Sequence, residues 1–271
     1  MEDLINKSVQ MTGKNPVTGA QNYGAFIGTE WMEWFAISYD AVKPYSGDTM
    51  LLSDLDMDEY INYIKDSEEV LNYFKGMEKM VASSPAGIAT ESGNEKFFTE
   101  DNDIAINYAT NNATSPMMKY IYADSTDVTD RFIPFVIPTG KNGQQGFPEF
   151  FRLAINKGAK DPDAAWEVVK SVTTNKEIVD FYLKNYASDK VTALRDVEGM
   201  SMFDYEFNKE RYENQMKTVF ITDDYWTWRT PLQDANNLLI SKEITAEEGR
   251  EKFYQGAVSW VENTKAQLGQ E

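Results

Sequence analysis

The sequence predicts an α/β protein whose chain passes from one lobe to another. Residues 131–138 (RFIPFVIP) are typical of a strand that ends at Pro138, and the glycine-rich residues 139–146 (TGKNGQQG) have no periodicity. Residues 149–156 (EFFRLAIN) form an almost continuous apolar run, which is typical of a strand buried on both faces. Two strands joined by such a passage indicate a crossover between lobes.

A helix is predicted directly after the second strand. Asp161 can cap its start, and Pro162 suits the first helical position. Ala165, Val168 and Val172 then recur at helical spacing. The order strand, glycine-rich passage, strand and amphipathic helix completes the α/β pattern.

Composition excludes several functional classes. The chain of 271 residues has 44 acidic and 26 basic residues, so its net charge of −18 argues against nucleic acid or anionic lipid as a partner. Without Cys or His it has no disulfide, no histidine acid–base catalysis and few options for zinc. Carboxylates alone could hold Ca²⁺, but no D-x-D-x-D-G loop is present, and we predict neither a metal site nor a cofactor. No signal peptide opens the chain, and no apolar run approaches the roughly 18 residues of a membrane span.

The crossover also resembles a known family. Pro138, Gly140, residues 153–157 (LAINK) and residues 161–170 (DPDAAWEVVK) occur in the order found in extracellular solute-binding proteins of ABC importers, in the maltose-binding-protein-like group (family 1). A capped helix after a strand is common in α/β proteins, so the ordered set carries the resemblance. It implies a periplasmic-binding-protein-like fold of type II, in which two lobes have mixed sheets flanked by helices.

The first 28 residues extend this resemblance. A helix closed by Gly13, a polar turn at 15–19 (NPVTG) and a strand at 23–28 (YGAFIG) match segments that lie well inside the mature family members. The resemblance implies that the N-terminal third and the export signal are absent and that the first lobe is incomplete.

The same resemblance divides the chain into three parts. Residues 1–137 belong to the second lobe, residues 138–200 return into the first, and residues 201–271 supply C-terminal helices that pack on the second.

Further elements follow from caps and periodicity. Ser67 predicts the start of a helix at 67–83 with a core stripe of Val70, Leu71, Phe74, Met77 and Met80. Residues 41–57 are expected to form a loop or hairpin, and residues 94–110 a short helix, a turn and a strand. Other helices are predicted at 29–40 (capped by Thr29), 115–123, 175–187 (capped by Asn175), 203–220, from Pro231 behind Thr230, and at the C-terminus, where Thr245 and Glu248 form a capping box.

An aromatic patch precedes the helix predicted at Pro231. It contains Tyr225, Trp226, Trp228 and Arg229 among polar neighbours. The structural interpretation is that at least one Trp fills the junction between lobes. The functional interpretation is a platform for the apolar face of a pyranose, where burial of roughly 80 Å² contributes on the order of 2 kcal/mol.

The resemblance assigns roles to particular residues. Trp31 matches an aromatic that faces the cleft, although two tryptophans on a generic helix are more often core, and Trp34 is expected to pack. Trp228 best matches the aromatic that stacks on the sugar, with Trp226 close behind. Asn107 and Tyr108 end a strand and are expected to face the cleft, because ligands lie outside strand ends in such sheets. Asn107 and Tyr108 would donate hydrogen bonds to the solute or accept them, and Arg229 would donate them.

The function implied is capture of a small solute, an oligosaccharide, for delivery to ABC permease subunits by hinge closure without catalysis. The location implied is extracytoplasmic, as a cell-surface lipoprotein or a periplasmic protein. One alternative is a glycoside hydrolase, which needs two carboxylates about 5–9 Å apart in a cleft. The other is an interaction protein on the same scaffold.

Self-association is a further expectation. The strand at 149–156 is predicted to be buried on both faces, yet the sheet neighbours that the resemblance gives it would lie in the absent part. Unpaired edges and uncovered apolar faces recruit partners. We therefore expect pairing with another copy or chain, or a poorly covered first lobe.

Overall fold

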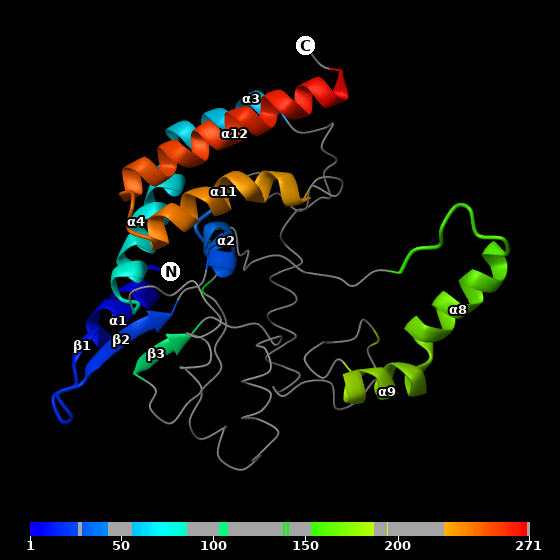
Figure 1. Cartoon of the computed structure of the whole chain (residues 1–271), viewed down its shortest axis with the longest axis horizontal. Helices are drawn as coiled ribbons and strands as arrows, with labels where there is room; N and C mark the ends of the chain where they lie inside the picture. The colour runs from blue at the N-terminus through cyan, green and yellow to red at the C-terminus, as the bar shows by residue number, and fades with distance from the viewer. Residues whose placement is uncertain are drawn as a thin grey trace.

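A computed structural model describes residues 1–26, 29–42, 56–85, 103–107, 138, 140, 153–186, 194 and 225–269 of the chain. These residues form helices and one sheet, as the α/β prediction requires (Figure 1). In chain order the elements are α1 (Glu2–Met11), β1 (Gly13–Lys14), β2 (Gln21–Phe26), α2 (Thr29–Ser38), α3 (Met57–Asp66), α4 (Glu68–Ala82), β3 (Ile104–Asn107), α8 (Pro162–Thr174), α9 (Lys176–Tyr186), α11 (Tyr225–Ile240) and α12 (Ala246–Leu268). The two-lobed type II arrangement and the division into parts remain predictions.

The sheet is small and mixed. Its strand order is β1-β2-β3, with β1 antiparallel to β2 and β2 parallel to β3. The predicted turn at 15–19 joins β1 to β2, and Asn15 Oδ1 accepts hydrogen bonds from the backbone N–H groups of Val17 and Thr18. Gly19 has φ 71°, which suits glycine. Helix α1 ends at Met11 with Thr12 as its C-cap, so Gly13, predicted to close the helix, follows the cap directly and also begins β1.

The Thr12 hydroxyl connects α1 to β2, and a backbone hydrogen bond connects β2 to the end of α4. Thr12 Oγ1 donates to the carbonyl of Ser8 at 2.8 Å, and the Gly24 N–H donates to Thr12 Oγ1 at 2.9 Å. The Ala25 N–H donates to the carbonyl of Ser83 at 3.3 Å. These bonds satisfy backbone groups where α1 ends against the strand.

The helix predicted at 67–83 is confirmed as α4. Ser67 Oγ accepts from the Val70 N–H at 3.1 Å, as an N-cap does. Its buried stripe contains Val70, Phe74, Met77 and Met80, as predicted, with Tyr73 also buried and Leu71 only half-buried.

The sequence interpretation missed α3. Residues 43–55 of the predicted loop lie outside the described residues, but a helix begins at Met57 behind an N-cap at Asp56. Met57, Tyr60 and Ile64 recur at helical spacing and are buried. Lys265 Nζ of α12 lies 2.7 Å from Asp58 Oδ1 of α3, so the terminal helix covers this element.

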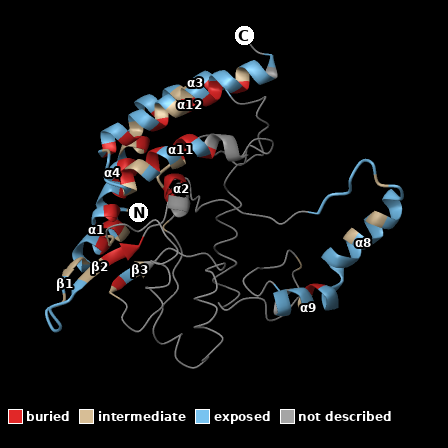
Figure 2. Ribbon diagram, in the orientation of Figure 1, coloured by how far each residue is buried: buried red, intermediate tan, exposed pale blue. Residues whose placement is uncertain are grey.

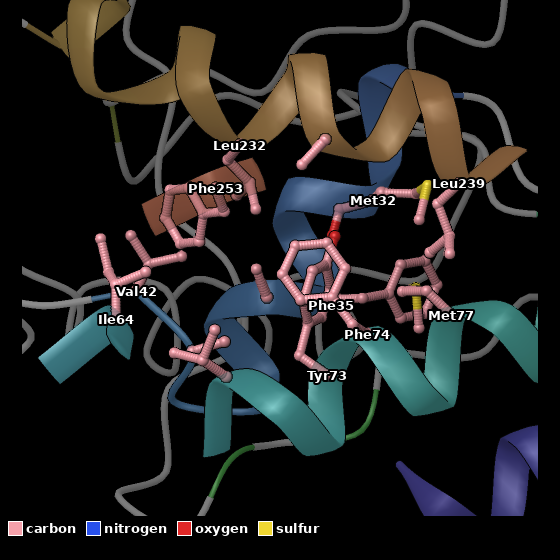
Figure 3. Close-up of a cluster of buried hydrophobic side chains, with 14 of the residues drawn as sticks. Met32, Phe35, Val42, Ile64, Tyr73, Phe74, Met77, Leu232, Leu239 and Phe253 are labelled. Carbon is pink, nitrogen blue, oxygen red and sulfur yellow. The ribbon is translucent and has the colours of Figure 1, made fainter. Parts of the chain in front are cut away.

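The hydrophobic core lies between helices from both ends of the chain. Helices α11 and α12 pack on each other and on α2, α3 and α4, and Figure 2 shows buried residues concentrated there. Figure 3 shows side chains from α2, α4, α11 and α12 meeting in one cluster, with Phe35, Phe74 and Leu239 among them.

The capping box that starts α12 is confirmed, and hydrogen bonds from Thr245 hold the pKa of Glu248 below its usual value. No helix in the described part of the chain is both long and apolar enough to cross a membrane.

The two helices after the crossover are confirmed, but the strand before them is not. Asp161 caps α8 with Pro162 in its first turn, and Asn175 Oδ1 accepts from the backbone of Glu177 ahead of α9. Residues 153–156 were predicted to be a buried strand, yet they are exposed and form no strand. No described strand lies beside them to complete a ladder, and apolar pattern alone cannot supply that partner.

Several predicted elements lie outside the described residues. These are the helices at 115–123 and 203–220, the strand at 131–138 except for Pro138, and residues 149–152 of the second strand. Of the segment 94–110, the strand is confirmed as β3, and residues 94–102 and 108–110 lie outside.

Alkaline solution is expected to unfold this core. Desolvation raises the pKa of Tyr60 and of Tyr73 well above the ordinary value of about 10. The folded state keeps these phenols neutral while the unfolded chain ionises them, so their contribution to stability is complete below pH about 10 and falls as the pH rises further. Urea unfolding followed across this range should show the free energy of unfolding decreasing.

Tyr60→Phe provides the check on this pH dependence. It removes one ionisable phenol from the buried set and should therefore make the alkaline loss less steep. A free energy of unfolding that stays constant from neutral pH to well above pH 10 would contradict the prediction.

Candidate functional site

Two parallel strands end side by side and so define one edge of the sheet. The register pairs Tyr23 with Ile104 and Phe26 with Asn107, so β2 and β3 reach their carboxyl ends together. The chain leaves β2 at Phe26 and enters α2 at Thr29. In open α/β sheets ligands bind outside this kind of edge. It is therefore the candidate functional site.

Two of the predicted ligand-binding residues have their backbones at this edge. Asn107 is the last residue of β3, and Trp31 lies in the first turn of α2. Tyr108 lies outside the described residues, as do the side chains of Asn107 and Trp31. The fold thus brings the Trp31 and Asn107 segments to one end of the sheet, and their predicted contacts with a solute remain predictions.

The aromatic patch lies within α11 and not ahead of it. Helix α11 begins at Tyr225, so the prediction that it starts at Pro231 was wrong. Proline lacks an N–H and usually marks the first turn. Here Pro231 is buried in the helix interior, and the added Cβ of an alanine at Gly256 of α12 would lie 2.9 Å from its Cβ. Packing of α11 on α12 therefore outweighs the local proline signal.

Arg229 is placed in the interior of the protein. Its exposed fraction is 5%. A buried guanidinium needs partners, because desolvation of its charge is costly. A solute would reach Arg229 only if α11 lined the predicted cleft. The side chains of Tyr225, Trp226 and Trp228 are outside the description, although all three belong to α11.

A buried polar contact fixes α2 and α11 against α4. Tyr73 Oη of α4 lies 3.1 Å from the carbonyl oxygen of Met32 in α2 and 2.9 Å from Asn236 Oδ1 in α11. Tyr73 and Asn236 have no exposed surface. Met32 follows Trp31 directly, and Asn236 lies about 12 Å along the helix from Trp228. One hydroxyl therefore connects the two helices that carry the predicted tryptophans.

Sequence reasoning missed this contact. Asn236 and Tyr73 are 163 residues apart, so no local pattern joins them. One signal was available, because Asn236 is a polar residue between Leu232 and Leu239 on an apolar helix face. A buried amide at such a position needs a hydrogen-bond partner.

The described carboxylates include one that caps a helix, and they form no cluster placed to hold a metal ion. No group of three or more acidic side chains there is placed to hold a metal ion. The carboxyl of Glu248 is exposed and held ionised by its cap, which is the opposite of what a general acid requires. The described residues place the carboxyl ends of two parallel strands beside α2, which belongs to the buried helical core.

Comparison of the chain with protein-family models, with curated proteins and with solved structures found no match.

Proposed function

We propose that this chain is the solute-binding component of an ABC importer and that it captures an oligosaccharide in a cleft between two lobes. The observation that supports the proposal is the shared carboxyl end of β2 and β3, because Asn107 ends β3 and the chain passes from the end of β2 into the helix that carries Trp31. The ordered resemblance of residues 138–170 to solute-binding proteins supplies the transport role.

The residues assigned to the solute match the two surfaces of a sugar. The ring of Trp31 or Trp228 would stack on the apolar C–H face, each contributing on the order of 2 kcal/mol. Asn107, Tyr108 and Arg229 would form hydrogen bonds with the hydroxyl groups at the rim of the sugar. Tyr225 and Trp226 would lie beside them. A net charge of −18 disfavours anionic solutes and leaves a neutral oligosaccharide unaffected.

Binding and release would proceed without a covalent step. Closure around the solute is favoured when contacts in the closed state outweigh the free energy of bending the hinge. The Tyr73 contact holds α2 and α11 in one body during that motion. The solute passes unchanged to permease subunits, in an extracytoplasmic setting as a cell-surface lipoprotein or a periplasmic protein.

A thermal-shift screen against mono- and oligosaccharides tests the proposal. A ligand that binds only the folded state raises the melting temperature, and the rise grows with the logarithm of its concentration once that exceeds the dissociation constant. Turnover of a chromogenic glycoside would support a glycoside hydrolase instead. No shift with any sugar would favour an interaction protein on the same scaffold.

Trp31→Ala and Trp228→Ala are each expected to weaken sugar binding by about 30-fold, because about 2 kcal/mol of stacking is lost. Calorimetric titration of each variant measures the change. Trp166→Ala is the matched control, since Trp166 is exposed on α8 and has no assigned role in binding. Unchanged affinity in both variants would show that neither Trp31 nor Trp228 stacks on the sugar.

A further inference from the structure

Two polar side chains lie in contact inside the apolar helical core. Tyr73 of α4 and Asn236 of α11 have no exposed surface. Asn236 stands between the buried Leu232 and Leu239 along α11, and Figure 3 shows Tyr73 in one cluster with both leucines. A buried polar group costs free energy unless it is hydrogen-bonded, and a leucine would suit this part of α11 without any bond. The polar pair therefore calls for an explanation other than burial.

The Tyr73 hydroxyl has one proton and two oxygen neighbours. Its Oη lies 3.1 Å from the carbonyl oxygen of Met32 in α2 and 2.9 Å from Oδ1 of Asn236. One proton cannot be donated fully to both oxygens. With its oxygen toward Tyr73, Asn236 also leaves Nδ2 buried and without a hydrogen-bond partner among the described residues. A buried donor without an acceptor is costly.

A half-turn of the Asn236 amide removes both conflicts. The amide has nearly the same shape either way round, so Nδ2 takes the position 2.9 Å from Tyr73 Oη. Asn236 then donates to Tyr73, and Tyr73 donates its proton to the Met32 carbonyl. The amide oxygen turned away is an acceptor, which is left unpaired more readily than a donor. We call the order Asn236, Tyr73, Met32 the relay, because it runs from α11 through α4 to α2.

We propose that this relay positions the first turn of α2, which carries Trp31, against α11, which carries Trp228 and Arg229. Met32 follows Trp31 directly, so a bond to the Met32 carbonyl fixes that turn from the side of the core. Asn236 and Arg229 lie on the same side of α11, because seven residues make about two helical turns. The roles of Trp31, Trp228 and Arg229 in sugar binding rest on the proposed function, whereas the relay rests on the buried contacts alone.

Two variants separate positioning from stability. Tyr73→Phe leaves the Asn236 amide buried without its partner, so the melting temperature should fall by about 5 °C. The double variant Tyr73→Phe/Asn236→Leu replaces both polar partners by apolar groups of similar shape, which is nearly neutral. Its melting temperature should therefore return to within about 2 °C of the unmodified chain. An unchanged melting temperature in Tyr73→Phe, or no recovery in the double variant, contradicts the pairing.

The direction of the relay is read from the Asn236 amide. In a chain made with isotope-labelled asparagine, Asn236→Leu identifies the side-chain amide signals of Asn236. These protons should show a strong nuclear Overhauser contact with the Tyr73 ring, because Nδ2 faces the hydroxyl. Absence of that contact would mean that the amide oxygen faces Tyr73, and the relay as proposed would be wrong.

Fluorine NMR of the chain labelled with fluorotryptophan reads the position of Trp31 without any sugar. Trp31→Phe and Trp166→Phe assign the two signals that are compared. In the double variant the Trp31 signal should move, because α2 has lost its bond to Tyr73, while the signal of the exposed Trp166 stays in place. Tyr60→Phe is the control, since it removes a buried hydroxyl that has no partner among the described residues, and both signals should stay in place. A Trp31 signal that stays in place in the double variant overturns the proposal.

Sugar affinity supplies the functional readout. For an oligosaccharide that the unmodified chain binds, the double variant should bind roughly tenfold more weakly although it is as stable. Trp31→Ala added to the double variant should then cost only about threefold more, because changes that act through one ring do not add. A further loss of about 30-fold would show that the relay does not act through Trp31. An unmodified chain that binds no sugar contradicts the proposed function, and the Trp31 signal then decides the relay by itself.

Discussion

Phe74→Ala is expected to lower the free energy of unfolding by about 3–5 kcal/mol, the range for removing a large aromatic ring from a closed core. Phe74 has no exposed surface, and its ring lies 5.0 Å from that of Tyr73 and 6.3 Å from that of Phe253 in α12. The site cannot collapse easily, because a Cβ added at Gly249 would lie 2.7 Å from the Phe74 ring, so α12 already packs closely there.

Urea unfolding monitored by circular dichroism measures this loss. Phe181→Ala is the matched control, since it removes the same ring from a position that is 60% exposed on α9. At about 1 µM chain, where association contributes little, the control should change the free energy of unfolding by less than about 0.5 kcal/mol. Similar losses in the two variants would show that Phe74 does not lie in the common core.

Gly24→Ala is expected to destabilise the fold by about 3 kcal/mol or more, at the upper end for forcing extra atoms into a packed interior. A Cβ at this position would lie 1.6 Å from the backbone oxygen of Ser8 and 2.4 Å from its carbonyl carbon. Both are backbone atoms, so no side-chain rotation relieves the overlap. Helix α1 would have to move away from β2, and the hydrogen bond from the Gly24 N–H to Thr12 Oγ1 would be strained.

Gly158→Ala provides the comparison for this substitution. Gly158 is exposed, and its added Cβ would meet only the side-chain oxygen of Asn156, at 3.3 Å. Its effect should lie within about 0.5 kcal/mol of zero. A Gly24→Ala variant as stable as Gly158→Ala would mean that α1 does not pack against β2 as described.

Local chemistry explains what the sequence predicted correctly. Ser67, Asp161, Asn175 and the Thr245–Glu248 pair all cap helices through hydrogen bonds within three residues. Such contacts depend on neighbouring residues alone. Helix starts at these positions could therefore be read directly, together with the stripe that α4 buries.

Elements that depend on distant partners could not be read in the same way. Helix α3 is covered by α12 from the far end of the chain, and α11 continues through Pro231 because α12 packs on it. Residues 153–156 have the apolar pattern of a strand and no described strand to pair with. The pattern of apolar residues predicts which side chains avoid water. Contacts with residues far away in the sequence decide whether those residues form a helix, a strand or neither.

In the candidate site, too, local features could be predicted from the sequence and features that depend on helix packing could not. The strand end at Asn107 could be predicted because β-branched and apolar residues precede it in Ile104–Asn107. The burial of Arg229 and its place inside α11 could not be predicted, because both follow from helix packing. The contact between Tyr73 and Asn236 could not be predicted either, because 163 residues separate them in the sequence.

The central claim is that the chain binds an oligosaccharide without hydrolysing it. Calorimetric titration of the full chain with a series of neutral oligosaccharides tests it most directly, provided that the mass of the recovered sugar is then measured by mass spectrometry. The account predicts saturable binding of one sugar per chain with the sugar recovered intact. Absence of binding heat across the series, or recovery of a hydrolysed sugar, would contradict it.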